Sequence, residues 1–103
     1  MPARLLSAAL ATTFATMGAG AQDFVAADHY EEICSNCHGP TAKGMASFPK
    51  LAGQDAEYLQ TRLEQYRAGE TVGYNTALMA PHAADLTDEQ IEALASYIAE
   101  TFE

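Results

Sequence analysis

Three stretches of the chain repeat their apolar positions every three to four residues, the period of a helix with one buried face. The first runs from about Asp23 into Cys37 and places Ala27, Tyr30, Cys34 and Cys37 on one face. No alternating run is long enough for a strand, and neither Asn-Gly nor Asp-Gly occurs to turn a hairpin. The pattern therefore predicts an all-α chain.

The second and third helices have clear ends in the sequence. Asp55 can cap the second helix and Gly69 can end it. Its apolar face carries Leu59, Leu63 and Tyr66. The third helix begins at a capping box, in which Thr87 caps the first turn and Gln90 bonds back to the cap. Its predicted buried stripe is Ile91, Leu94, Ala95, Ile98 and Phe102.

Two loops are expected between these helices, from Gly39 to Gln54 and from Glu70 to Asp85. Both are longer than the connections typical of compact helical domains. A domain this small also has a thin core and often needs a disulfide, a metal or a cofactor to be stable. The loops therefore indicate a chain that wraps around another group.

The first 21 residues read as a separate segment. Arg4 gives a positive start, an uncharged Leu- and Ala-rich stretch follows, and Ala19 and Ala21 are the small residues that a signal peptidase requires. The layout predicts a secretory signal peptide over residues 1–21 and one domain over residues 22–103. The alternative is a retained membrane anchor, for which the stretch is short against the roughly 20 residues of a span.

Charge narrows the classes of partner. Five Lys and Arg face fourteen Asp and Glu, for a formal net charge of -9. Such a chain is a poor candidate for binding nucleic acid or an anionic membrane surface. Hydrophobic residues make up 49% of the chain, which excludes a disordered acidic tail. Two cysteines exclude a disulfide-dense scaffold.

The strongest chemical signal is the run Cys34-Ser35-Asn36-Cys37-His38. Two thiols three residues apart on a helix can add to the two vinyl groups of a haem, and the following imidazole can bind the iron as proximal ligand. This is the attachment pattern of c-type haem. It predicts one covalent haem c on Cys34, Cys37 and His38.

Other uses of the same cysteines are less consistent with the chain. A thioredoxin-like redox pair needs a βαβ setting that the pattern lacks. A structural zinc site needs four ligands, and only His29 and His82 remain to complete one, without the usual spacing. A plain disulfide explains neither His38 nor the long loops.

The opposite side of the iron needs a second ligand, for which Met79 is the candidate. It lies in Ala77-Leu78-Met79-Ala80-Pro81, just before the last helix, and a soft thioether suits a Met/His electron carrier. Met45 lies in a polar loop close to His38 and reads as loop filler. His82, three residues beyond Met79, is the competing ligand.

The chain resembles the class I cytochromes c, and most closely the small bacterial c553- and c4-like branch. The matching segments are Cys34 to Gly39, Pro49 to Gln54, Asp55 to Leu59, Met79, Leu86 to Glu89 and Leu94 to Ile98. Their ordered combination covers nearly all of residues 22–103. It is far more specific than the cysteine motif alone.

The resemblance implies an all-α class I cytochrome c fold, with three main helices and long loops wrapped around one covalently bound haem. His38 and Met79 match the iron ligands, and Pro49 matches the proline whose carbonyl accepts the proton of the ligand histidine. The first and last helices are implied to cross, with Tyr30 and Tyr97 at the aromatic positions. The chain departs from many members at Ala26, where they have glycine.

The predicted function is therefore a periplasmic carrier of single electrons and not an enzyme. Its implied partners are redox proteins, namely a donor dehydrogenase and an acceptor cytochrome or oxidase, without stable membrane insertion. Two alternatives keep the haem: a tightly bound subunit of a dehydrogenase, and a ligand sensor with an open sixth site. The expected docking face surrounds the haem edge and contains Ala46, Phe48, Ala80 and Pro81, with Lys43 and Lys50 at its rim.

Overall fold

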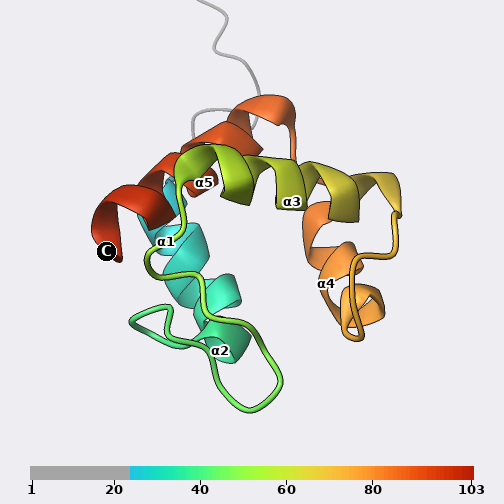
Figure 1. The fold of residues 1–103 in the computed structure, drawn as a ribbon. Helices are drawn as coiled ribbons and strands as arrows, with labels where there is room; N and C mark the ends of the chain where they lie inside the picture. Colours follow the sequence, from blue (N-terminus) through green and yellow to red (C-terminus); the bar gives the residue numbers. More distant parts are fainter. Residues whose placement is uncertain (1–23) are drawn as a thin grey trace, which may run out of the picture.

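The computed structural model describes residues 24–103 as a helical domain (Figure 1). The helical elements are α1 (Ala26–His29), η2 (Tyr30–Cys34), α2 (Ser35–His38), α3 (Ala56–Ala68), α4 (Thr76–Ala83) and α5 (Asp88–Thr101). Within this range no strand forms, and Met45 and Phe48 make one isolated bridge. The all-α prediction is confirmed. The predicted signal peptide and its cleavage before Gln22 lie outside the described residues.

The first helix is continuous in the chain but changes its winding. Between α1 and α2 it passes through one π-helical turn, Tyr30–Cys34, and it ends at Gly39, whose φ is +92°. Single π turns are wider than α turns and occur often at functional sites. Here Tyr30 is buried in the core while Cys34 is only half-buried. The periodicity of the sequence does not signal this turn.

The two capped helices form where the sequence predicts them. The Asp55 carboxylate accepts from the Tyr58 N–H at 2.8 Å, and α3 ends at Gly69, which is left-handed with φ +82°. The Thr87 hydroxyl accepts from the Gln90 N–H at 3.1 Å, and the Gln90 side chain accepts from the Thr87 N–H at 3.0 Å. Both hydrogen bonds of the capping box are therefore present.

Helix α4 corrects the prediction of one long loop from Glu70 to Asp85. A proline inside a helix removes a donor and is unfavourable, so Pro81 disfavours a helix there. Packing outweighs this cost because Ala83, at the end of α4, is fully buried with Leu86 and Ile91. The other expected loop, residues 39–54, contains no helix.

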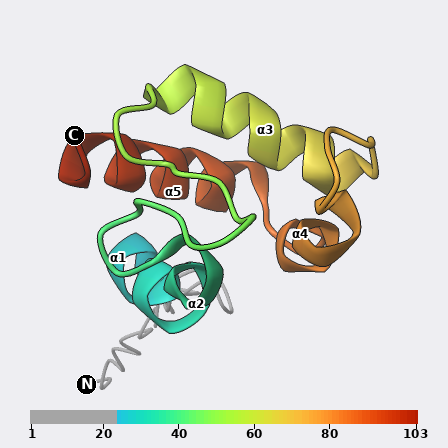
Figure 2. The ribbon, with the colours of Figure 1, turned by 60° about the horizontal axis from the view of Figure 1, so that its bottom comes forward.

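Helix α5 organises the core. It runs beside α3 and packs against α1, while α4 packs under the far end of α3 (Figures 1 and 2). Four positions of its predicted stripe are buried, namely Ile91, Leu94, Ala95 and Ile98, and Phe102 is half-buried. None of the helices in residues 24–103 has the length and apolarity needed to cross a membrane.

The crossing of the first and last helices is filled by aromatic rings. The Tyr30 ring lies with its centroid 6.2 Å from that of Tyr97 and 5.0 Å from that of Phe102. The Tyr30 hydroxyl donates to the Gly39 carbonyl at 2.6 Å, and burial raises the pKa of Tyr30 to about 12. Ala26 is half-buried against the cluster around Ile91, so the methyl group is accommodated at the crossing.

Candidate functional site

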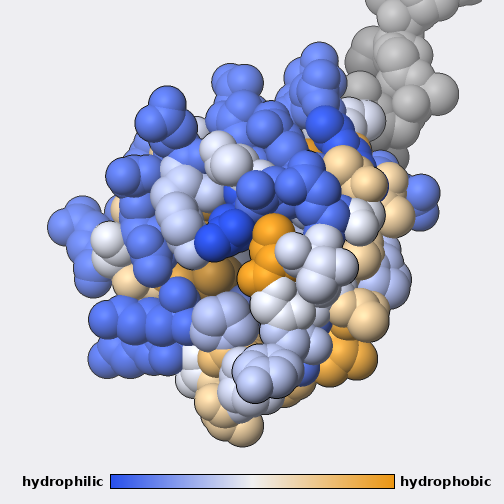
Figure 3. All heavy atoms as spheres, turned by 45° about the vertical axis from the view of Figure 1, so that its right-hand side comes forward, coloured by the Kyte–Doolittle hydropathy of each residue, from blue (hydrophilic) through white to orange (hydrophobic). Residues whose placement is uncertain are grey.

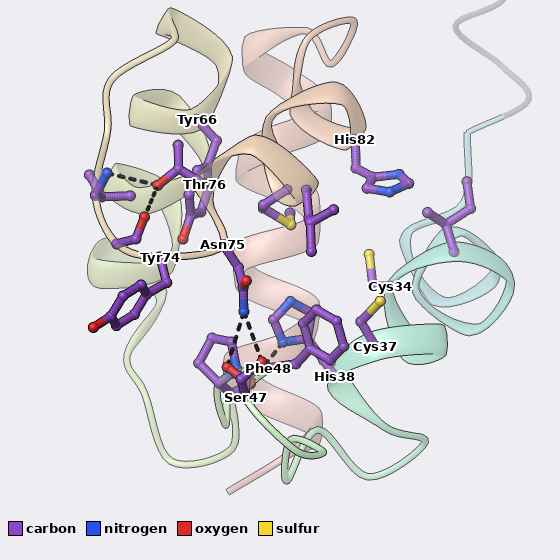
Figure 4. A pocket seen from close by; sticks show the side chains of 16 residues that line it. Cys34, Cys37, His38, Ser47, Phe48, Tyr66, Tyr74, Asn75, Thr76 and His82 are labelled. Atoms are coloured by element: carbon purple, nitrogen blue, oxygen red, sulfur yellow. Dashed lines mark hydrogen bonds between the residues drawn. The ribbon is translucent and has the colours of Figure 1, made fainter.

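A cavity of about 490 Å³ opens between the first helix, the loop after it, and α4 (Figure 4). Its volume lies in the range of cofactor sites. Each of the two expected loops contributes wall residues: Ser47, Phe48 and Pro49 on one side, and Val72 to Thr76 on the other. A smaller hollow of about 80 Å³ adjoins it and shares five of its residues. These are Cys34, His38, Pro49, Tyr66 and Met79.

All five residues singled out from the sequence line this cavity: Cys34, Cys37, His38, Pro49 and Met79. They come from the first helix, the loop after it, and α4, so only the fold brings them together. Met45 is not among the lining residues and is 45% exposed. Of the two methionines after residue 21, Met79 lines the cavity and Met45 does not.

His38 is buried and its ring is held by one hydrogen bond. Its Nδ1 lies 2.8 Å from the carbonyl oxygen of Pro49, which can only accept, so Nδ1 is the donor. In the neutral ring this tautomer leaves the lone pair of Nε2 available to a metal. A histidine ligand whose other nitrogen donates to a carbonyl is the usual arrangement at metal centres.

Cys34 and Cys37 are free, half-buried thiols that open onto the cavity (Figure 4). Burial raises the pKa of the Cys34 thiol to about 11, which is the opposite of what a redox or metal-binding thiolate needs. In residues 24–103, no three side chains of His, Cys, Asp or Glu gather in a way that could hold a metal ion. The raised pKa of Cys34 argues against a reactive thiolate at this position.

His82, the competing ligand, also lines the cavity from α4. In Figure 4 its ring lies on the Cys34 side of the cavity. It is exposed and close enough to His29 to influence it: burial lowers the pKa of His29, nearby Glu32 opposes this, and His82 adds to the lowering. His82 is thus associated with the α1 side of the cavity.

The cavity wall is mostly apolar. None of the described residues that line it is Asp, Glu, Lys or Arg, and His38 and His82 are its titratable nitrogen bases. Nine further lining residues were not singled out from the sequence as site residues: Ile33, Ser47, Tyr66, Val72, Gly73, Tyr74, Asn75, Thr76 and Leu78. The unexplained length of the loops was the signal that could have pointed to most of them.

Two polar contacts tie the walls together. The Asn75 side-chain amide donates to the Ser47 hydroxyl at 3.1 Å and approaches the Ser47 carbonyl at 3.4 Å (Figure 4). The Thr76 hydroxyl accepts from the Val72 N–H at 2.9 Å and donates to the Gly73 carbonyl at 2.9 Å. The Asn75 bonds connect the loop after the first helix to the residue before α4. The Thr76 bonds close the turn of residues 72–76 on the other wall.

These groups fit a c-type haem by their chemistry. A mostly apolar cavity suits the flat macrocycle, and two thiols at its wall suit the two vinyl groups. An imidazole with one nitrogen already committed and a soft thioether supply two ligands of the kinds that haem iron takes.

Comparison with known proteins gives one consistent result. The family model for cytochrome c matches residues 26–102. Cytochrome c-554(547) of Halothiobacillus neapolitanus is 38% identical over 78 residues, which is 68% of this chain and 86% of that protein. The thiosulfate dehydrogenase electron acceptor of Stutzerimonas stutzeri is 42% identical over 67 residues, 64% of this chain but 31% of that longer protein.

A solved structure agrees with the family match and with the two relatives. The reduced recombinant cytochrome c4 from Pseudomonas stutzeri superimposes with a TM-score of 0.63 at 34% sequence identity. The match covers 76% of this chain and 48% of the other.

Proposed function

Since this chain belongs to the cytochrome c family, whose members bind haem c covalently and carry electrons, we propose that it is a periplasmic single-electron carrier. In this proposal Cys34 and Cys37 would hold the haem by thioether bonds, and His38 and Met79 would supply the two protein ligands of its iron. The iron, when bound, supplies the one-electron chemistry by cycling between its ferrous and ferric states.

The observation that carries the proposal is the bond between His38 Nδ1 and the Pro49 carbonyl, at the wall of a cavity that Cys34, Cys37 and Met79 also line. The bond holds the imidazole in one orientation and keeps Nε2 free for the iron. Met79 adds a neutral, soft sulfur, which favours the ferrous state and raises the potential. The apolar wall keeps water away from the bound group, which further limits reorganisation when an electron arrives.

Residues 1–21 are proposed to direct export and to be removed, which leaves a domain of residues 22–103.

Intact-mass spectrometry of the denatured protein tests both points together. From a host that matures c-type cytochromes, we expect a chain that starts at Gln22 and carries the mass of one haem. The double variant Cys34→Ala and Cys37→Ala is the control and should lack the added mass. A wild-type chain without added mass would contradict covalent attachment, and a chain that still starts at Met1 would contradict cleavage.

The proposed partners are redox proteins, with a periplasmic dehydrogenase as donor and a cytochrome or oxidase as acceptor. One relative is itself named as the electron acceptor of thiosulfate dehydrogenase, which supports a dehydrogenase as donor here. Redox contacts of this class are small, below about 1,200 Å², because they must form and part quickly.

The docking face proposed for these partners surrounds the cavity mouth. Of the apolar residues expected there, Ala46 and Pro81 are exposed, whereas Phe48 and Ala80 are half-buried. Tyr74 and Leu78, which the sequence did not single out for docking, are exposed and line the cavity. In Figure 3, hydrophilic side chains cover the upper part of the molecule, over α3 and α5, and hydrophobic ones are interspersed lower down. An apolar centre within an acidic molecule favours transient contact with a partner of basic surface.

Charge reversal tests this face. The exposed Lys43 and Lys50 lie in the loop of residues 39–54, on either side of the cavity-lining residues 47–49, whereas Glu92 and Glu100 are exposed on α5. With the physiological partner, we expect Lys43→Glu and Lys50→Glu to change the second-order rate of electron transfer and its ionic-strength dependence more than Glu92→Lys and Glu100→Lys. A larger effect of the α5 variants would place the docking face elsewhere.

A further inference from the structure

The loop between Gly39 and Gln54 is unusually tight around Gly44. A Cβ atom placed on Gly44 would lie 2.6 Å from the Phe48 carbonyl oxygen, 3.0 Å from the Lys50 backbone nitrogen and 3.1 Å from the Pro49 carbonyl carbon. Real Cβ contacts are not found at the first of these distances. The backbone of Gly44 is therefore packed directly against the segment that supplies the hydrogen-bond acceptor of His38.

Gly44 also contacts the other end of that hydrogen bond. Its N–H donates to the His38 carbonyl oxygen at 2.8 Å, while His38 Nδ1 donates to the Pro49 carbonyl at 2.8 Å. Gly44 thus lies between the backbone of His38, to which it is hydrogen-bonded, and Pro49, whose carbonyl accepts from the His38 ring. We call Gly44 the spacer between these two groups.

Backbone hydrogen bonds hold the loop around Gly44 in one conformation. The Phe48 N–H donates to the Met45 carbonyl at 2.8 Å, which closes a tight turn just after Gly44. The Ala42 carbonyl accepts from both the Leu51 and Ala52 N–H groups, at 2.8 and 2.9 Å. Ala42 is fully buried and left-handed, with φ +60°, a conformation that persists in an alanine only when its surroundings hold it there.

We propose that Gly44 is a positioning residue that sets the length of the His38–Pro49 hydrogen bond and, through it, the reduction potential. The inference rests on the proposed function, since it requires His38 to bind the iron. A strong bond from Nδ1–H to a carbonyl makes the imidazole a better donor, which stabilises ferric iron and lowers the potential. A side chain at position 44 would push Pro49 away, weaken this bond and raise the potential.

The test compares Gly44→Ala with Gly53→Ala. Both glycines are left-handed, with φ +83° and +84°, so alanine is equally strained in the two backbones. They differ in their surroundings: a Cβ on Gly53 meets no described atom within 4 Å. Gly53→Ala therefore controls for backbone strain, and the difference between the two variants reports the close approach of residues 48–50.

Two readouts are measured on the haem-loaded protein. The reduction potential is expected to rise in Gly44→Ala and to stay at the wild-type value in Gly53→Ala. Proton NMR should show the His38 Nδ1–H exchanging with solvent about three- to tenfold faster in Gly44→Ala, the range expected for one weakened hydrogen bond. Equal potentials and equal exchange rates in the two variants would overturn the proposal.

A second comparison applies if Gly44→Ala does not fold. Pro49→Gly frees the backbone next to the clash, and the double variant Gly44→Ala with Pro49→Gly is then compared with Pro49→Gly alone. A higher potential in the double variant supports the spacer role, and equal potentials reject it. If the wild-type protein itself shows no histidine-bound iron, the ligand assignment fails instead, whatever the glycine variants do.

Discussion

Replacing Met79 with alanine is expected to open the iron to external ligands and to lower the reduction potential. The thioether favours ferrous iron, so its loss favours the ferric state. While Met79 is bound, an external ligand can enter only the minor open state, which for such equilibria is typically about 0.1–10% populated. Its removal should therefore raise the affinity of ferric protein for imidazole by about 10- to 1,000-fold.

The matched control is His82→Ala, one turn further along α4 at the same cavity. We expect this variant to keep the wild-type visible spectrum, potential and imidazole affinity. Changes in His82→Ala together with an unaltered Met79→Ala would make His82 the ligand. Tight carbon monoxide binding by the ferrous wild-type protein would instead indicate an open sixth site, and with it a sensor in place of a carrier.

Replacing Ile91 with alanine is expected to lower the free energy of unfolding by about 2–5 kcal/mol, the range for removing a large aliphatic side chain from a core. Ile91 is fully buried and clusters with Ala83, Leu86 and Leu94. The cluster joins α5 to the end of α4, the helix that carries Met79. Denaturant unfolding of the oxidised haem-loaded protein, followed by far-UV circular dichroism, measures the change.

Glu92→Ala on the same helix is the control for this stability change. Its side chain is exposed, and alanine is a good helix former, so the free energy of unfolding should stay within about 0.5 kcal/mol of wild type. A similar loss of stability in both variants would mean that α5 is sensitive along its whole surface and that the Ile91 cluster is not its anchor.

Much of the fold was accessible from local patterns. The caps at Asp55 and Thr87 use hydrogen bonds between residues three apart, and both form as expected. The buried stripe of α5 follows from the helical period alone. Helix α4 was missed because Pro81 disfavours a helix locally, whereas the burial of Ala83 that stabilises it involves residues from α5.

The candidate site likewise combines features that the sequence shows with features that only the fold shows. Cys34, Cys37 and His38 lie within five consecutive residues, so their motif can be recognised without a fold. The role of Gly44 was not readable, since the atoms that a Cβ would meet belong to a turn whose closure the sequence does not specify. The exposed Tyr74 and Leu78 were likewise assigned to no surface until α4 was placed.

By itself, the sequence determined the all-α class, the ends of two helices and the identity of the haem-attachment motif, because each depends on residues within about one helical turn of one another. Only the tertiary structure decided that Met79 lines the cavity and Met45 does not, that a π turn runs from Tyr30 to Cys34, and that Gly44 packs against Pro49. These features depend on how two long loops close over one cavity. That closure is set by the summed packing of distant residues, which no short segment of the sequence encodes.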